Sequence, residues 1–308
     1  MADGAIDVHS MRLDATRAAF HRIYAGEDLH GRAASIAEAR RRGMPRTAET
    51  HDLTSGSMTF DGLHAGLAAI KPLARGGSFC DLGSGVGAAV IAAALLHPWK
   101  ACIGVELMQD LHDQACQAHR KFEALRATLE RPDNGRPLDA RMLAQRMQFV
   151  CGDLFDVPLR ELEAPAVIFC CCVTWPPDLM FRLARKLAEE LDDGTYVLTV
   201  GKPMPHQVVA AGGGLQAQEA IQQPPSERVT FREIWHGMAQ LDWGSETLVL
   251  HCTHRASSPP CRSPSPSRAV PESRDHVAAS QNAMATTISP TPDDVVSRYG
   301  KIKRCTLQ

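Results

Sequence analysis

A turn with glycine at every second position, at Gly83, Gly85 and Gly87, limits what this chain can fold into more than any other feature. A short apolar run at 78–82 precedes the turn, and an alanine-rich segment at 88–96, which favours a helix, follows it. Glycine adopts backbone angles closed to other residues and places no Cβ between the chain and a ligand. The stretch therefore predicts a strand, a tight turn that a ligand approaches closely, and a helix N-terminus.

Three acidic residues near strand ends indicate the kind of ligand. Asp81 stands two residues before the first glycine, Glu106 ends a predicted strand at 101–106, and Asp153 follows a predicted strand at 147–150. A carboxylate beside the turn repels a pyrophosphate and suits a cationic ligand, of which S-adenosylmethionine is the common nucleotide example. An acid about twenty residues after the turn stands where ribose hydroxyls are bound in dinucleotide folds. The pattern favours a class I methyltransferase, and a dinucleotide oxidoreductase remains the rival.

The same residues also have a simpler structural interpretation. A lone glycine turn is often only a tight connection between a strand and a helix. Asp153 would then cap a helix, and Glu106 would be a solvated strand end. The arrival of all three acids at one sheet edge favours the cofactor interpretation.

The composition is that of an ordinary soluble globular protein. Of the 308 residues, 44% are hydrophobic and 22% are charged, and the formal net charge of -2 gives no overall attraction to nucleic acid or anionic membrane. The ten cysteines follow no signal peptide, so we expect reduced, intracellular thiols. No apolar stretch approaches the roughly 18 residues of a membrane helix, so we expect no membrane contact.

Predicted strands and helices alternate along the chain. The further strands are expected at 166–170, 195–200, 228–235 and 246–251, and the further helices at 11–24, 60–70, 109–130 and 178–190. This alternation predicts an α/β fold with a doubly wound sheet and a ligand at the carboxyl ends of its strands. The last two strands predict an antiparallel hairpin at the sheet edge.

Three regions follow from the composition. Residues 1–50 form an N-terminal helical segment, residues 51–255 hold the α/β domain, and the serine- and proline-rich residues 256–308 form a tail that we expect to be disordered.

Two basic clusters are candidates for weak contact with nucleic acid. Arg40, Arg41 and Arg42 end a predicted helix at 33–42, and a smaller cluster closes the tail at 301–304. The simpler interpretation of the arginines is a solvated helix end that faces the carbonyl dipoles. The tail cluster is alternatively a nuclear address.

Taken together, three motifs resemble the disruptor-of-telomeric-silencing family of non-SET histone-lysine methyltransferases. They are DLGSGVG at 81–87, GVE at 104–106 and GD at 152–153. Segments at 56–61, 167–169 and 201–203 are similar to further family motifs, and 243–250 is more loosely similar to the family's closing strand. The resemblance covers about residues 50 to 255.

This resemblance implies a seven-stranded class I methyltransferase sheet, Rossmann-like in form, with S-adenosylmethionine as cofactor. It also implies a histone or nucleosome as substrate and a nuclear location. Asp81 and the glycine turn would hold the methionine end of the cofactor, Glu106 the ribose and Asp153 the adenine amino group. The full set of expected cofactor-binding residues is Gly56, Ser57, Asp81, Gly83, Ser84, Gly85, Gly87, Glu106, Asp153 and Leu154.

The expected acceptor side departs from the family pattern. Where the family's fourth strand ends in two asparagines, this chain has Cys171 and Cys172, and we expect both to line the acceptor together with Trp175. Leu250 stands in place of an aromatic of the family's lysine channel, and residues 57–58 replace a glutamate and a threonine of its loop. Plain core packing is the alternative for the two cysteines and the tryptophan.

Further alternatives stay open for the function. The chain would methylate a small molecule or a non-histone protein, or it would bind the cofactor as a scaffold without turnover. A zinc site built from residues 170–172 with His251, Cys252 and His254 lacks the usual C-x-x-C spacing, so no metal is expected.

Overall fold

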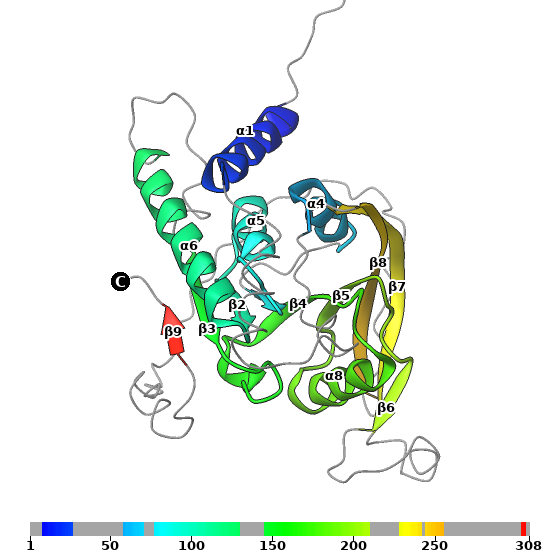
Figure 1. The fold of residues 1–308 in the computed structure, drawn as a ribbon. Helices are drawn as coiled ribbons and strands as arrows, with labels where there is room; N and C mark the ends of the chain where they lie inside the picture. Colours follow the sequence, from blue (N-terminus) through cyan, green and yellow to red (C-terminus); the bar gives the residue numbers. More distant parts are fainter. Residues whose placement is uncertain are drawn as a thin grey trace, which may run out of the picture.

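The computed structural model describes residues 8–26, 58–70, 77–129, 145–209, 228–241, 244–255 and 303–305. Within these residues, nine strands form one sheet in the order β6-β7-β8-β5-β4-β1-β2-β3-β9 (Figure 1). The strands are β1 (Ser78–Leu82), β2 (Ala101–Glu106), β3 (Arg146–Cys151), β4 (Pro165–Cys171), β5 (Tyr196–Val200), β6 (Gln207–Val209), β7 (Arg228–Leu241), β8 (Gly244–Arg255) and β9 (Lys303–Cys305). The central strands, in the sheet order β5-β4-β1-β2-β3, pair in parallel. The pairings that involve β6, β7, β8 and β9 are antiparallel.

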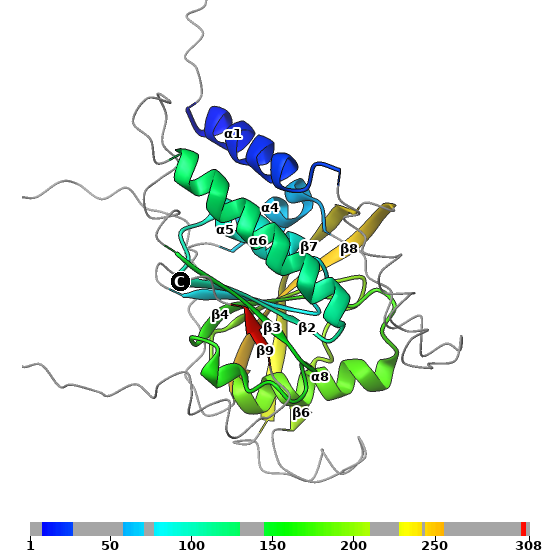
Figure 2. The ribbon, with the colours of Figure 1, turned by 60° about the vertical axis from the view of Figure 1, so that its left-hand side comes forward.

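Helices cover both faces of this sheet. They are α1 (Val8–Ile23), α4 (Phe60–Ala68), α5 (Ala88–Leu96), α6 (Gln109–Leu129) and α8 (Pro177–Glu190), with a short 3-10 helix, η2 (Leu159–Glu161). Figure 2 shows α1, α4, α5 and α6 on one side of the sheet and α8 on the other. The predicted doubly wound α/β fold is therefore confirmed.

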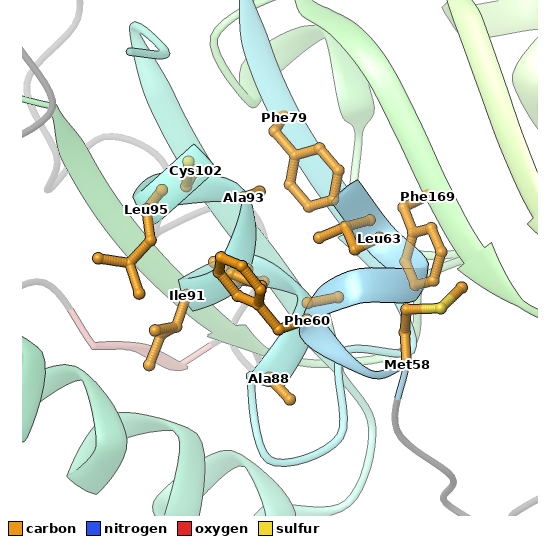
Figure 3. Close-up of a cluster of buried hydrophobic side chains, with 14 of the residues drawn as sticks. Met58, Phe60, Leu63, Phe79, Ala88, Ile91, Ala93, Leu95, Cys102 and Phe169 are labelled. Carbon is orange, nitrogen blue, oxygen red and sulfur yellow. The ribbon is translucent and has the colours of Figure 1, made fainter. Parts of the chain in front are cut away.

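Two apolar cores lie one on each face of the sheet, so residues on both faces of the central strands are buried. This explains the mostly apolar sequences of these strands. In β1, Phe79 faces the core under α4 and α5, while Cys80 and Leu82 face the core under α8. The Phe79 ring stacks on Phe169 of β4 with ring centroids 6.3 Å apart, and Figure 3 shows both rings near Leu63 of α4. Burial of one such side chain contributes about 1.5–3 kcal/mol, so the central strands are held from both sides.

The last two long strands confirm the predicted hairpin but extend well beyond its predicted bounds. β7 and β8 pair along almost their whole length, from Val229 opposite Arg255 to Leu241 opposite Gly244. β8 also pairs with β5, so the hairpin continues the sheet. Polar residues on the solvent face of both strands hide their ends in the sequence, because an exposed face carries no apolar signal.

The two edge strands are additions to the seven predicted strands. β6 pairs with the start of β7, and β9 pairs with β3. The prediction of a disordered tail over 256–308 was wrong for residues 303–305, because an open strand edge offers backbone hydrogen bonds to any short segment whatever its side chains. Residues 256–302 lie outside the described part of the chain, as do the predicted helix at 33–42 and the arginines at 40–42.

The described helices also bear on membrane contact. Across the described ranges, none of them is both long and apolar enough to cross a membrane.

Candidate active site

The candidate site lies at the carboxyl ends of the parallel strands, where the sheet topology reverses. β1 pairs with β2 on one side and with β4 on the other. The chain leaves β1 for α5 on one face of the sheet, and it leaves β4 for α8 on the opposite face. In open α/β sheets this divergence leaves a crevice beside the strand ends, and ligands bind there.

The glycine turn, residues 83–87, has the backbone geometry that its sequence predicts. Gly83, Gly85 and Gly87 have φ angles of 89°, 53° and 82°, all in the region that side chains disfavour. A Cβ on Gly87 would lie 2.8 Å from the Phe149 ring, so space as well as conformation excludes a side chain there. The N–H of Gly83 donates to the Val105 carbonyl at 2.9 Å, which presses the turn against β2.

Glu106, the last residue of β2, holds the turn from the sheet side with both of its carboxylate oxygens. Its Oε2 accepts a hydrogen bond from the N–H of Gly85 at 2.7 Å, and its Oε1 accepts one from the N–H of Met108 at 2.8 Å. The residue is only 7% exposed, so the alternative of a solvated strand end is wrong. Through these two hydrogen bonds the carboxylate ties the glycine turn to the residues that follow β2.

Asp81 and Ser84 each carry a buried polar atom that accepts or donates no hydrogen bond within the described residues. Asp81 is 2% exposed, and neither its Oδ1 nor the Oγ of Ser84 has a hydrogen-bond partner among the described residues. Burial, and next to it the nearby charge of Glu106, raise the pKa of Asp81 well above its ordinary value. Buried polar atoms are nearly always hydrogen-bonded, so two such atoms beside a glycine turn fit a ligand that supplies hydrogen-bond donors and positive charge.

Asp153 joins the same edge through β3. The N–H of Gly152 donates to the Glu106 carbonyl at 2.9 Å, which places the two strand ends together. The Oδ1 of Asp153 accepts from the N–H of Phe155 at 2.8 Å, so the side chain shapes the turn that follows β3 rather than capping a helix. Asp153 and Leu154 are both half-buried. The structure thus brings Asp81, the glycine turn and Asp153 to one edge.

Two predicted cofactor residues, Gly56 and Ser57, lie outside the described residues. The residues that directly follow them contact the hairpin. Met58 forms a β-bridge with Leu241, and the hydroxyl of Thr59 donates to the Gln240 carbonyl at 2.5 Å. The start of α4 is therefore tied to the far end of β7.

The two predicted acceptor cysteines have different environments. Cys171 is half-buried, whereas Cys172 is fully buried in the core under α8. The thiol of Cys172 donates to the Val200 carbonyl at 3.2 Å, and its contact with the thiol of Cys170 lowers its pKa. Cys172 therefore follows the core-packing alternative, and Cys171 is the cysteine with an accessible surface.

Trp175 connects the acceptor loop, residues 172–175, to the glycine turn. The residue is 8% exposed, and its ring lies 4.0 Å from the position that a Cβ on Gly83 would take. The ammonium group of Lys202 donates to the Trp175 carbonyl, and Val173 fills the space beside Gly201. The end of β5 thus fixes the acceptor loop.

Sequence reasoning missed two residues that support this site, Lys202 and Tyr24. Lys202 was noticed only as part of a motif, and Tyr24, at the end of α1, donates its hydroxyl to the carbonyl of Val86 in the glycine turn at 3.2 Å. Both residues act on backbone carbonyls far away in the sequence, so neither residue spacing nor residue type signals the contact. The position of Lys202 directly after β5, at the sheet edge where ligands bind, was the one sequence signal that could have indicated its role.

The metal alternative finds no support in the described residues, which hold no group of three or more histidine, cysteine or acidic side chains arranged for a metal ion. The Nε2 of buried His251 accepts from the N–H of Met204 at 3.3 Å, and its Nδ1 lies 3.4 Å from the Val197 carbonyl. Burial lowers the pKa of His251, which makes it a neutral structural residue. The described cysteines are free thiols, as expected.

Comparison with known families gives one match. Residues 56–205 match the family described as histone methylation protein DOT1, a segment just under half of the chain. The match confirms the predicted family resemblance over these residues, and the described part of them contains the glycine turn, Glu106, Asp153 and the acceptor loop. No curated protein matches the chain.

Several of the similar solved structures are methyltransferases. An RNA methyltransferase from Salinibacter ruber in complex with S-adenosylhomocysteine is 20% identical over 59% of this chain and 84% of its own, with a TM-score of 0.35. Magnesium protoporphyrin IX methyltransferase from Synechocystis PCC 6803 with bound S-adenosylmethionine is 15% identical over 82% and 99%, with a TM-score of 0.38. The rRNA methyltransferase aviRa from Streptomyces viridochromogenes is 15% identical over 64% and 82%, with a TM-score of 0.38. At these TM-scores the similarity carries no conclusion about this chain.

Proposed function

We propose that this chain is an S-adenosylmethionine-dependent methyltransferase that modifies a lysine of a histone or nucleosome in the nucleus. The observation that carries the proposal is the buried, unpartnered Oδ1 of Asp81 beside three glycines with positive φ. This arrangement suits a ligand that is cationic and lies close to the backbone. The match of residues 56–205 to the DOT1 histone methylation family supports the same activity and the histone class of substrate.

The residues present fit the cofactor at both of its polar ends. Asp81 and Ser84 would hold the ammonium-bearing methionine end, since both have a buried atom free for a hydrogen bond. Glu106 would accept from the ribose hydroxyls while it keeps the turn in place. Asp153 and Leu154 would border the adenine, with Gly56 and Ser57 covering the cofactor.

Methyl transfer from a sulfonium is an in-line displacement, so the protein mainly positions donor and acceptor and excludes water. When bound, S-adenosylmethionine supplies an activated methyl group. The acceptor amine must arrive neutral, and an apolar surface lowers the pKa of a lysine by desolvation. Trp175, whose ring lies near Gly83, and the half-buried Cys171 would provide this surface, while Lys202 holds the acceptor loop in place.

A second function has a specific observation in its favour. Where the family carries two asparagines, Cys172 is buried with its thiol bonded to Val200, so that position offers no side chain to an acceptor. A different acceptor, such as a small molecule or a non-histone protein, or a scaffold without turnover, follows from this. Contact with nucleic acid through Arg40, Arg41 and Arg42 or the tail remains a proposal that concerns residues outside the described ranges.

The test begins with calorimetric titration of the purified full chain with S-adenosylmethionine. Binding that Asp81→Asn weakens at least about tenfold would support the cofactor site, because one charge-assisted contact is worth about 1.5–3 kcal/mol. Absence of binding by a folded protein would refute the proposal. Methyl transfer is then measured on nucleosomes, free histones and small-molecule amines. Transfer to nucleosomes alone supports the lysine assignment, transfer to amines alone supports the small-molecule alternative, and binding without any transfer identifies the scaffold.

A further inference from the structure

Tyr24 reaches the glycine turn from the N-terminal helix. It directly follows α1, is 5% exposed, and donates its hydroxyl to the Val86 carbonyl at 3.2 Å across 62 positions of sequence. Val86 stands between Gly85 and Gly87, both of which have positive φ angles. An element outside the matched segment 56–205 therefore contacts the centre of the candidate cofactor site.

The hydroxyl of Tyr24 binds a carbonyl of the turn, whereas the contacts from β2 bind its N–H groups. The carbonyl of Val105 and the carboxylate of Glu106 hold the N–H groups of the turn from the sheet side. Tyr24 holds a carbonyl of the turn from the helix side. A turn with three glycines has many accessible conformations, so its external contacts decide which conformation is populated.

The helix that carries Tyr24 is docked independently of this hydroxyl. The guanidinium of Arg17 in α1 donates to Oδ1 of Asp61 in α4 from Nη2 at 2.7 Å and from Nε at 3.0 Å, and to Oδ2 from Nε at 3.2 Å. The Phe20 ring packs on Phe60, with centroids 5.6 Å apart. Removal of one hydroxyl therefore leaves α1 docked on α4.

We propose that Tyr24 is a positioning residue which, through Val86, holds the glycine turn in the conformation that binds the cofactor. The inference rests on the proposed function, because the ligand is S-adenosylmethionine. Without the hydroxyl, the Val86 carbonyl loses a buried donor, and the cofactor has to select the productive turn from a broader set of conformations. The affinity for the cofactor falls, while the rate of methyl transfer at saturation stays the same.

The test compares Tyr24→Phe with Ile23→Val, both in the full chain. Ile23 is the neighbouring buried residue, and its aliphatic side chain offers the turn no hydrogen-bond donor, so its truncation costs about 0.5–1.5 kcal/mol of stability without removing such a bond. Calorimetric titration should give a Kd for S-adenosylmethionine about five- to twentyfold higher in Tyr24→Phe and unchanged in Ile23→Val. Hydrogen exchange of the amides at 83–87 should be faster in Tyr24→Phe alone.

Each outcome decides the question. A raised Kd and raised KM for the cofactor with unchanged kcat support the proposal. A Kd within twofold of the wild type, or a Tyr24→Phe variant that fails to fold by circular dichroism, overturns it, because the hydroxyl would then be merely structural. Failure of the wild type itself to bind S-adenosylmethionine would instead refute the proposed function.

Discussion

Binding of S-adenosylmethionine should tighten as the pH rises, because the cofactor's positive charge requires an ionised Asp81. Burial and the charge of Glu106 raise the pKa of Asp81 in the free protein, so it keeps a proton where an exposed aspartate has lost one. The thiols of Cys80 and Cys170 also interact with Asp81, but their own pKa values are raised, so they add no charge. Lys186 of α8 acts on Cys80 and is paired with a glutamate.

The size of the effect follows from releasing one proton. At pH values below the pKa of Asp81 in the free protein, Kd falls about tenfold for each pH unit gained, and above that pKa it is constant. In a titration series from about pH 5 to pH 7, each pH unit below that raised pKa is therefore worth about 1.4 kcal/mol of binding free energy. The folded, cofactor-free protein binds the extra proton, so its free energy of unfolding falls as the pH rises from about 4 through the raised pKa.

Calorimetric titration across this range measures both the Kd and the proton. The series stops near pH 7, because the amino group of the cofactor itself titrates at about 7.7–8.0. Titration in two buffers with different heats of ionisation gives the number of protons released, which should approach one. Asp81→Asn should remove the slope, whereas Ser84→Ala should weaken binding and keep the slope.

Two results would refute this reasoning. A Kd that does not change from about pH 5 to pH 7, with equal heats in both buffers, would mean that Asp81 loses no proton on binding. A slope that persists in Asp81→Asn would assign the proton to another group.

Three further substitutions test the site. Gly87→Ala forces a residue with a side chain to adopt a φ of 82° and places its Cβ against the Phe149 ring. Thermal unfolding should show that the free energy of unfolding falls by about 1–3 kcal/mol, and titration should show no cofactor binding. A variant as stable as the wild type would contradict the geometry. Glu106→Gln replaces one acceptor oxygen by a donor that faces a backbone N–H, so Kd should rise about 10- to 100-fold, and an unchanged Kd would exclude its role. Lys202→Met removes the hydrogen bond to the Trp175 carbonyl that holds the acceptor loop. In the methyl-transfer assay kcat should therefore fall about tenfold, while Kd for the cofactor stays within twofold. A raised Kd with an unchanged kcat would instead place Lys202 in cofactor binding.

The central part of the fold was predictable because its signals are local. β1, the glycine turn and α5 are adjacent in sequence, and α5 has the predicted bounds of 88–96. β2 likewise matches its predicted range, since all six of its residues are buried and the apolar run has no gap except at its last residue. The ends of the hairpin and the three-residue strand β9 were not predictable, because backbone pairing at an edge leaves no pattern in the side chains.

The candidate site was predictable only where strand ends determine it. Asp81, Glu106 and Asp153 were expected at one edge because parallel strands deliver their carboxyl ends together. Burial of Cys172 was not determined by the sequence, because alternate residues of a strand face opposite sides and the run of three cysteines fits either register. The contact of Tyr24 was equally hidden, since it joins residues 62 positions apart.

The edge strand β9 closes one side of the sheet with a segment of the same chain. β3 would otherwise present an open edge of backbone donors and acceptors, and three residues from the far end of the same chain occupy it. A strand from a second molecule fits the same edge, so the two compete through effective concentration, which for a tethered segment is in the millimolar range or below. Well below that concentration, the strand of the same chain has the advantage over a strand from another molecule.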